Sequence, residues 1–277
     1  MDASLNHPVS PLIRKLESIF ALSDDERQAI LDLPLQVTHL RADQDIVREG
    51  DRPTRSCVLL EGFAAMFKVT AEGKRQITAF YIPGDIPDLQ SLHLEVLDTS
   101  LGTLSPCKVG FIQHEALQDL CDRNPRIAKA LWRETLIDAS IFREWTVNVG
   151  RREAYARIAH ILCELTVRMK AVGLTRDDTC KIPITQNEFA DATGLSTVHV
   201  NRVLQALRSD GLIVLKGDTL QIPDWDQLKQ AGDFDPTYLH TQAGSGMSLT
   251  LQPVRSRPGA MKKECWSLPT SSGSWRC

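Results

Sequence analysis

The chain has 277 residues, of which 42% are hydrophobic, and its formal net charge is −3. This length suits about two domains of ordinary size. No apolar run is long enough to cross a bilayer, and the N-terminus lacks the basic start and apolar stretch of a secretory signal. We therefore expect a cytoplasmic protein that does not contact membranes, and its bulk charge does not indicate a nucleic-acid binder.

The cysteines do not form a metal-binding or redox motif. They number seven, are scattered, and include no C-x-x-C pair, which argues against a zinc ribbon or a cysteine-held iron–sulfur cluster. Most are expected to be small buried or surface residues in a reducing compartment. A redox role stays open for three of them, Cys107, Cys121 and Cys163.

Residues 1–36 are predicted to be helical in pieces, with a capping box from Ser23 to Glu26. Residues 37–113 differ, because short runs rich in Val, Ile, Thr, Phe and Tyr alternate with turn residues. Turn glycines recur about every ten residues, which favours an all-β sandwich or barrel over βαβ units. They are Gly50, Gly62, Gly73, Gly84 and Gly102, and Glu72-Gly73 is expected to form a hairpin turn.

Residues 114–149 are predicted to be helical again. Their apolar positions fall near heptad spacing and cover more than one face, so the helix must be covered on more than one side. One side would pack on the β domain and the other on a partner subunit, although purely intramolecular packing would also explain the pattern. The predicted subunit contacts are Ile127, Leu131, Ile137, Ile141 and Trp145. Because glycine often marks a helix joint, Val149-Gly150 is expected to end the helix and mark the domain boundary.

A further amphipathic helix over 151–171 and a loop over 173–181 lead to TQNEFADATGLSTVHVNRVLQ, residues 185–205. This stretch predicts two short helices joined at Gly194. Thr185 and Glu188 can form a capping box, and Ser196 can cap the second helix. A helix pair joined by a short glycine turn is typical of a helix-turn-helix, whose second helix enters the DNA major groove.

The segment GLIVLKGDTLQI, residues 211–222, predicts a two-stranded wing with Gly217-Asp218 at its tip. There Lys216 could reach a flanking phosphate. Between residues 186 and 222, three basic residues face four acids, so the prediction of DNA binding rests on the helix pattern. From about residue 231 the chain is rich in Gly, Pro, Ser and Thr without periodicity, and we expect disorder.

In the order of these parts and in several motifs, the sequence resembles the Crp/Fnr family of bacterial transcription regulators over roughly residues 15–228. The motifs are REGD (48–51), LLEG (59–62), AEGKRQI (71–77), IPGD (82–85), SPCKVGFI (105–112), Asn124-Pro125, and the helix-turn-helix region itself. The resemblance implies an α+β protein with a double-stranded β-helix (jelly-roll-like) sensor domain, a long dimerisation helix and a winged helix-turn-helix. The expected boundaries are 1–123, 124–149 and 150–230, followed by a disordered tail over 231–277.

By this resemblance, the protein would bind a palindromic DNA operator as a homodimer, and RNA polymerase is a further partner that the family suggests. Arg202 resembles the family's base-contacting arginine, which can pair bidentately with guanine. Val198 stands where relatives that read the best-known half-sites carry Glu, so neither a TGTGA nor a TTGAT half-site is expected. The predicted DNA-binding residues are Thr185, Gln186, Ser196, Thr197, Val198, His199, Asn201, Arg202, Gln205 and Lys216.

The predicted effector region departs from the cyclic-nucleotide pattern of the family. Leu97-Asp98 stands where nucleotide binders carry Arg-Ser, and no Arg or Lys lies between Arg75 and Lys108, which argues against cyclic AMP. No cysteine precedes Cys57 for an Fnr-type cluster, and His93 is alone as a haem ligand. The weakly predicted pocket contains Asp88, Leu89, Leu92, Leu97, Asp98 and Thr99, with Leu94 and Val96 nearby.

The sequence predicts no cofactor, no metal site and no catalytic residue. The effector remains unknown: an apolar or weakly polar ligand, or no ligand, fits this region better than a nucleotide. Two alternatives stay open, a DNA-binding regulator without an effector and a metal-dependent β-barrel enzyme. The second needs clustered metal ligands, and the seven histidines show no such cluster.

Overall fold

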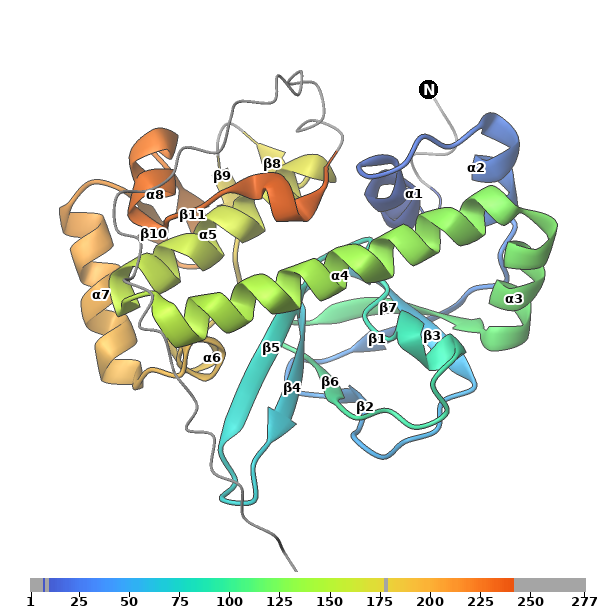
Figure 1. Cartoon of the computed structure of the whole chain (residues 1–277), viewed down its shortest axis with the longest axis horizontal. Helices are drawn as coiled ribbons and strands as arrows, with labels where there is room; N and C mark the ends of the chain where they lie inside the picture. The colour runs from blue at the N-terminus through green and yellow to red at the C-terminus, as the bar shows by residue number, and fades with distance from the viewer. Residues whose placement is uncertain (1–6, 8–9, 177–178, 242–277) are drawn as a thin grey trace, which may run out of the picture. The chain divides into compact units, whose positions relative to one another are not determined.

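The computed structural model describes residue 7 and residues 10–176 and 179–241. Figure 1 shows the element order, which begins with two short helices, α1 (Ser10–Glu17) and α2 (Asp24–Leu31). The predicted capping box opens α2: Ser23 accepts a hydrogen bond from the Glu26 backbone N–H, and Glu26 accepts one from the Ser23 backbone N–H. The apolar sides of both helices pack into one hydrophobic cluster with strand residues Val58 and Ile112.

Two antiparallel sheets form the predicted β domain. One sheet has the order β1-β7-β3 and the other has the order β2-β6-β4-β5. Side chains from both sheets, including Leu59, Met66 and Tyr81, share one buried cluster, so the sheets face each other. The strands are β1 (Gln36–Leu40), β2 (Asp45–Val47), β3 (Arg55–Glu61), β4 (Ala64–Val69), β5 (Arg75–Tyr81), β6 (Ser100–Thr103) and β7 (Cys107–Gln113), with a short 3-10 helix η2 (Leu89–Leu92) before β6.

Glycine is required at the turn between β3 and β4. Gly62 has a φ of +90°, and a Cβ built there would lie 2.4 Å from the Pro106 carbonyl oxygen. The β4–β5 hairpin was predicted at Glu72-Gly73, and Gly73 does occupy its turn, donating its backbone N–H to the Thr70 carbonyl. The local turn chemistry therefore fixes both corners.

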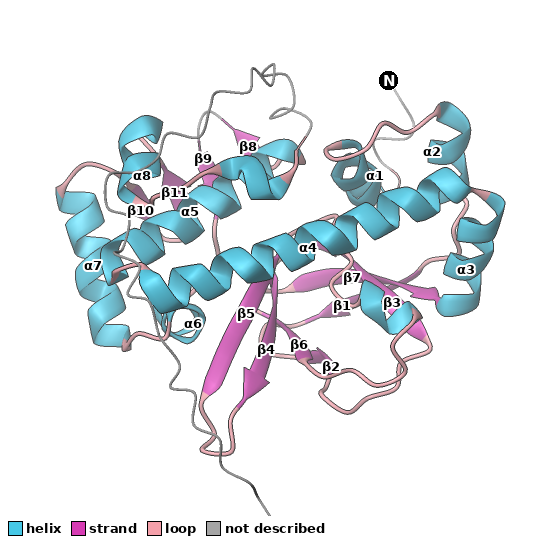
Figure 2. Cartoon of the chain, in the orientation of Figure 1, coloured by secondary structure: helices cyan, strands magenta, loops and turns pink. Residues whose placement is uncertain are grey.

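Two helices follow the sheets, α3 (His114–Arg123) and α4 (Pro125–Arg151). Figure 2 shows α4 as one uninterrupted helix. The predicted break at Val149-Gly150 is therefore wrong, and the joint lies at Arg152, whose extended backbone ends the helix. A lone glycine costs a helix only about 1 kcal/mol, and neighbours such as the buried Asn148 anchor this last turn.

The five predicted subunit contacts on α4 lie inside the protomer. Ile127 and Leu131 pack with α1 and α2, and three others, Ile137, Ile141 and Trp145, join the core beneath the C-terminal half. The prediction of an exposed seam at these positions is wrong, because the protomer itself covers that side of the helix. The exposed apolar side chains of α4 are instead Trp132, Leu136 and Val147.

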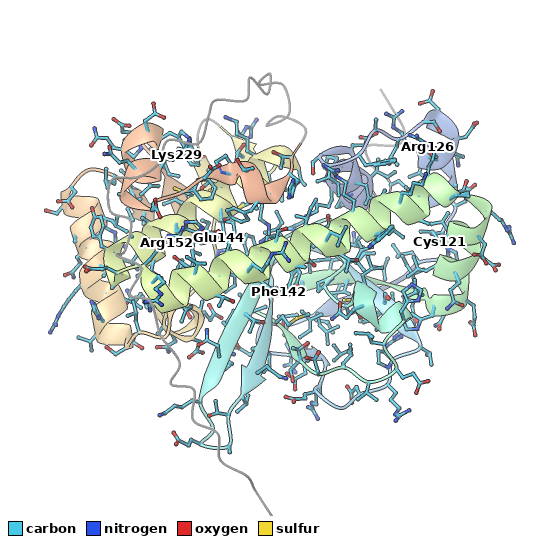
Figure 3. All side chains as sticks on the ribbon, viewed as in Figure 1. Cys121, Arg126, Phe142, Glu144, Arg152 and Lys229 are labelled. Atoms are coloured by element: carbon cyan, nitrogen blue, oxygen red, sulfur yellow. The ribbon has the colours of Figure 1, made fainter. Side chains whose placement is uncertain are left out.

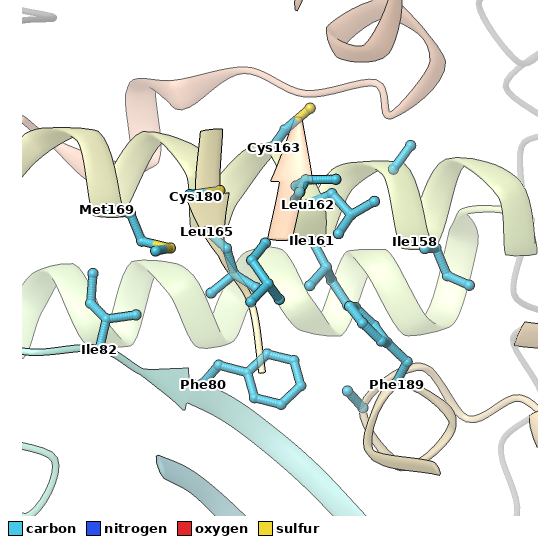
Figure 4. Close-up of a cluster of buried hydrophobic side chains, with 14 of the residues drawn as sticks. Phe80, Ile82, Ile158, Ile161, Leu162, Cys163, Leu165, Met169, Cys180 and Phe189 are labelled. Atoms are coloured by element: carbon cyan, nitrogen blue, oxygen red, sulfur yellow. The ribbon is translucent and has the colours of Figure 1, made fainter. Parts of the chain in front are cut away.

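The C-terminal half packs around the long helix α5 (Ala154–Ala171). Figure 4 shows its apolar side chains, among them Ile161 and Leu165, meeting Phe80 of β5 and Phe189. The predicted loop at 173–181 contains two short strands that complete a sheet of order β10-β11-β9-β8. The elements are β8 (Thr175–Arg176), β9 (Thr179–Lys181), α6 (Gln186–Thr193), α7 (Thr197–Ser209), β10 (Val214–Lys216), β11 (Thr219–Gln221), α8 (Trp225–Ala231) and a 3-10 helix η3 (Pro236–Leu239).

The prediction of disorder from residue 231 is wrong for the part that the structure describes. Phe234 and Leu239 are buried in the core, and Tyr238 donates a hydrogen bond of 2.8 Å to Glu164 of α5. Aromatic residues spaced along a polar stretch thus anchor it to the helix core. The rest of the predicted tail, from residue 242, lies outside the described residues. Among the described helices, none is both long and apolar enough to span a membrane.

Candidate nucleic-acid interface and sensor cavity

The helix pair α6–α7 has the local geometry that the sequence predicts. Thr185 and Glu188 form the reciprocal capping box of α6, and Gly194 ends that helix with a left-handed φ of +67°. Ser196 caps α7 by accepting a hydrogen bond from the His199 backbone N–H. These caps satisfy the backbone donors that a helix start leaves free, so the turn between the helices is defined by its own residues.

One face of α7 is available to a ligand. The side chains of His199, Arg202 and Gln205 are exposed, and Val198 is 62% exposed although it is apolar. The opposite face is buried through Val200, Val203, Leu204 and Leu207. The predicted reading residues therefore lie on the solvent side of the second helix.

Two further predicted residues hold α6 against α7. The Thr197 hydroxyl donates to Asn187 Oδ1 at 2.9 Å, and Asn201 Nδ2 donates to Gln186 Oε1 at 3.0 Å. Thr197 and Asn201 are half-buried as a result. Their side chains fix the angle between the helices, and Arg202 and Gln205 remain the long polar side chains that extend outward.

Two of the four acids of this region, Glu188 and Asp191, are engaged within the protein, whereas Asp210 and Asp218 are exposed. Glu188 is buried as a cap, Asp191 pairs with Arg75 at 2.7 Å, and Asp210 accepts a hydrogen bond from Tyr155 at 2.6 Å. The basic side chains of Arg202 and the wing residue Lys216 are exposed. Local charge on this face is therefore more positive than the residue count implies.

Strand β5 contacts α6 directly. Besides the Arg75–Asp191 ion pair, Gln76 Nε2 donates to the Ala192 carbonyl at 3.3 Å. The rings of Phe80 and Phe189 meet edge to face with centroids 6.3 Å apart. The β domain thus contacts the first helix of the DNA-binding pair through charge, hydrogen bonding and packing.

A cavity of about 600 Å³ lies between the β domain and α4, a size typical of small-molecule sites. Its lining includes Leu89, Asp98 and Thr99 from the predicted pocket. Figure 3 shows Phe142 of α4 at this side of the helix, where its ring packs against the β-domain core. A cavity therefore exists close to the predicted effector region, with α4 as one wall.

The remaining predicted pocket residues have other roles. Asp88 is buried and its Oδ1 accepts a hydrogen bond from the Cys57 backbone N–H at 2.8 Å; burial raises its pKa to about 6. Leu97 is buried and Leu92 is half-buried against a hydrophobic cluster, and neither is part of the cavity wall. The neighbouring positions expected to line an apolar pocket, Leu94 and Val96, are instead exposed at the surface.

Sequence reasoning missed the α4 and β5 side of the cavity. Glu134 and Asp138 of α4 line it together with Gln76, Thr78 and Tyr81 of β5. A signal was available, because two carboxylates four residues apart interrupt an otherwise apolar helical stripe. An apolar stripe indicates burial, and a carboxylate within it indicates a polar partner or a ligand.

Next to the cavity, a buried ion network joins the two halves. Lys15 contacts both Asp85 and Glu134 at 2.8 Å. Arg168 of α5 contacts Asp85 at 2.9 Å and Glu164 at 3.2 Å. Burial alone would raise the pKa of Asp85, but the adjacent Lys15 and Arg168 charges lower it, so Asp85 is held as a carboxylate.

The described cysteines are free thiols in environments that disfavour the thiolate. Burial raises the pKa of Cys163 to about 12 and also raises the pKa of Cys107 and of Cys121. Since the thiolate is the reactive form, these environments do not favour the redox role left open for the three residues. Within the part of the chain that the structure describes, no group of three or more His, Cys, Asp or Glu side chains is placed to hold a metal ion.

This architecture, a β-roll and a long helix followed by a winged helix-turn-helix, defines a class of DNA-binding transcription regulators. Residues 37–124 match the cyclic nucleotide-binding domain family, and residues 156–231 match the Crp-like helix-turn-helix domain family. The chain belongs to the Crp/Fnr family of transcription regulators.

Individual relatives agree. The chain is 27% identical over 224 residues to the transcriptional activator protein FnrL of Cereibacter sphaeroides, which covers 78% of this chain and 88% of that protein. It is 25% identical over 185 residues to the transcriptional activator protein anr of Pseudomonas aeruginosa, with 67% and 75% covered. The structure of FixK2 from Bradyrhizobium japonicum superposes with a TM-score of 0.66 at 22% identity, covering 72% of this chain and 98% of that one. These curated relatives are transcription regulators and not enzymes.

Proposed function

We propose that the protein binds a palindromic DNA operator as a homodimer and that the β domain controls this binding in response to a small molecule. The exposed face of α7 supports the DNA-binding part of this proposal. Arg202 extends outward from a helix whose opposite face is buried and whose first turn is capped. Arginine can donate two parallel hydrogen bonds to guanine. Val198 offers a thymine methyl an apolar contact. The proposal implies a cytoplasmic location, where the DNA is.

The exposed apolar side of α4 supports the homodimer. Trp132 is 68% and Leu136 is 54% exposed, and Val147 is also exposed. These positions lie about one and three helical turns apart, so they share one face. A second copy of α4 packed there would remove large apolar side chains from water, and it would place two α7 helices about a two-fold axis. A palindromic operator follows from that symmetry.

The position of Gln76 supports control by the β domain. Its side chain lines the cavity and also donates a hydrogen bond to the Ala192 carbonyl at the end of α6. A ligand in the cavity therefore contacts a strand that holds the helix-turn-helix. Ligand-dependent coupling of this kind is typically worth about 1–3 kcal/mol. FnrL and anr, two of the relatives named above, are transcriptional activators, and we propose the same outcome here, with recruitment of RNA polymerase.

The test begins with selection of bound duplexes from a randomised pool by the full-length chain. A recovered inverted repeat is expected, and a single unpaired site would contradict the two-fold arrangement. Arg202→Ala should then weaken binding to the selected operator by about 1–3 kcal/mol and relax base preference at one position in each half-site.

Lys216→Ala is the matched control, because Lys216 is exposed on the wing and is proposed to contact only phosphate. Lys216→Ala should weaken binding equally for all sequences. It should also reduce the slope of log affinity against log salt by the amount of about one phosphate contact per subunit. If Arg202→Ala behaves like Lys216→Ala, with unchanged base preference, Arg202 does not read the operator.

A further inference from the structure

The cavity between the β domain and α4 has an unusual charge for a site whose relatives include nucleotide binders. Three carboxylate residues line it, Asp98, Glu134 and Asp138, and no Lys or Arg is among the described residues of its wall. An anionic ligand would meet negative charge on this wall. The chemistry of the wall instead matches a ligand that carries positive charge.

One oxygen of Glu134 is left without a partner. The residue is 4% exposed, and Oε1 pairs with Lys15 at 2.8 Å. The other oxygen, Oε2, is buried without a hydrogen-bond partner in the described structure, and the residue lines the cavity. A buried carboxylate oxygen without a donor is costly, so a donor supplied from the cavity would stabilise it.

Negative charge is in excess around this oxygen. The cluster contains two cations, Lys15 and Arg168, and four acids, Asp85, Glu134, Asp138 and Glu164. Three of the acids form ion pairs with these cations, and Asp138 interacts with them electrostatically. Burial and the adjacent Glu134 carboxylate raise the pKa of Asp138 well above its usual range. The cations of the cluster therefore do not balance its acids, and a bound positive charge would reduce the excess.

The rest of the wall is aromatic and apolar. Tyr81, Phe142 and Trp145 line the cavity together with Met66 and Ile77. Aromatic faces attract organic cations, best when the cation is removed from water, and apolar side chains bury the body of such a ligand. Carboxylates beside aromatic rings are the complement of a protonated amine on an apolar framework.

We propose that the effector of this protein is an organic cation, a primary amine on an apolar or aromatic body, whose ammonium group donates to Glu134 and Asp138. The inference rests on the proposed function as a regulator with a sensor cavity. The ammonium would supply the donor that Glu134 Oε2 lacks and the charge that the cluster lacks. Tyr81, Phe142 and Trp145 would enclose the body of the ligand.

Matched probes test the charge requirement. Tryptamine, tryptophol and indole-3-acetate share one indole body and differ in carrying an ammonium, a hydroxyl or a carboxylate. Phenethylamine, 2-phenylethanol and phenylacetate form a second set with a smaller body. Binding to the full-length chain is measured by thermal shift and by titration calorimetry. We expect the amine of at least one set to raise Tm and to bind about tenfold or more tightly than its alcohol, and the acids to give no shift.

Asp138→Asn should abolish the preference for the amine over the alcohol while the variant stays folded. Asp122→Asn is the control, since Asp122 is an exposed carboxylate on α3 outside the cavity wall, and it should keep the preference. The proposal is overturned if no amine shifts Tm, if alcohol and amine bind equally, or if Asp138→Asn retains the full preference.

A second readout separates ligand binding from a merely structural role of Asp138. Because burial and Glu134 raise the pKa of Asp138, an ammonium bound beside it should lower that pKa and release protons, and calorimetry in buffers of different ionisation enthalpy measures this release. Asp138→Asn should release fewer. The groups around Asp138 that share the titration are Lys15 on α1, Tyr81 on β5, Asp85 after β5, Glu134 on α4 and Arg168 on α5.

Operator selection keeps the two proposals apart. If the chain selects an inverted repeat but binds no amine, the ligand class is wrong and the DNA-binding function stands. If it binds an amine through Asp138 but selects no operator, the proposed function is wrong, although the cation site remains.

Discussion

Replacing Arg168 with methionine should destabilise the protein strongly, because its guanidinium compensates two buried carboxylates. Arg168 is 5% exposed and bridges Asp85 and Glu164 at 2.9 and 3.2 Å. Removing one partner of a buried ion pair costs about 3–5 kcal/mol, since the other charge is left uncompensated. Methionine keeps much of the volume, so the loss reports charge and hydrogen bonding more than packing.

The contacts that survive place the expected loss at the lower end, about 3 kcal/mol. Asp85 keeps Lys15 at 2.8 Å and the Ile82 backbone N–H at 2.8 Å. Glu164 keeps hydrogen bonds from Trp145 Nε1 at 3.0 Å and from Tyr238 at 2.8 Å. Such a loss is a large share of the roughly 5–15 kcal/mol that stabilises an ordinary domain.

Urea unfolding followed by circular dichroism and by tryptophan fluorescence measures the change. With a slope of about 1–3 kcal/mol per molar urea, the midpoint should fall by about 1 M or more. Arg123→Met is the control, because Arg123 is an exposed arginine paired at 3.3 Å with Asp119 one turn away, and its loss should stay within about 0.5 kcal/mol. A midpoint for Arg168→Met equal to that of the control would refute the reasoning that the buried network depends on this charge.

Two further substitutions test the dimer face and a buried carboxyl. Leu136→Glu should give monomers in analytical ultracentrifugation and lose binding to the inverted repeat. Val69→Glu is the control, because Val69 is an apolar residue of similar exposure, 52%, and this variant should stay dimeric. A dimeric Leu136→Glu would contradict the proposed interface on α4. Asp88 has a folded-state pKa raised to about 6 from 3.8, so the stability it contributes is present below pH 4 and is lost as the pH rises to about 6. The loss is on the order of 3 kcal/mol. Urea midpoints measured between pH 4 and pH 6 should fall for the unmodified protein and stay level for Asp88→Asn. If the midpoints of the two proteins change with pH in parallel, Asp88 ionises without a penalty from burial.

The parts that the sequence predicts best are those that local chemistry determines. The capping box of Thr185 and Glu188, the left-handed Gly194 and the capping Ser196 all involve neighbours within a few residues. Each satisfies a backbone group in the same way in almost any fold. The helix-turn-helix was therefore predictable without knowledge of what surrounds it, and so was the exposed position of Arg202.

What covers an apolar helix face is not a local property. The heptad-like residues of α4 predict burial, and burial is what Ile137, Ile141 and Trp145 show, but the pattern does not distinguish a core from a partner subunit. Trp132 and Leu136 stand outside the strongest stripe and are the exposed side chains. The tail was misjudged for a similar reason, because Phe234 and Leu239 find their partners on helices distant in sequence.

The cavity beside α4 shows a different limit, because the known signature of a nucleotide ligand reveals only which residues the sequence lacks. Comparison with the nucleotide pattern showed the missing arginine at Leu97-Asp98 and left the ligand unspecified. The informative residues, Glu134 and Asp138, belong to α4 and reach the cavity only because that helix packs across the β domain. Glu134 also takes part in an ion network that reaches Arg168 of α5 through Lys15 and Asp85.

Glu134 shares Lys15 with Asp85, and Asp85 holds Arg168 of α5. A cation bound at Glu134 Oε2 would share that carboxylate with Lys15, weaken the attraction between Lys15 and Glu134, and leave Lys15 to pair more fully with Asp85. Asp85 would then pair less strongly with Arg168, and this weakens the contact between the β domain and α5. Such a shift needs no large movement in the cavity, because the groups lie within direct ion-pair distance. The excess of buried acid, which makes the network electrostatically costly, is thus also what lets a single positive charge alter it.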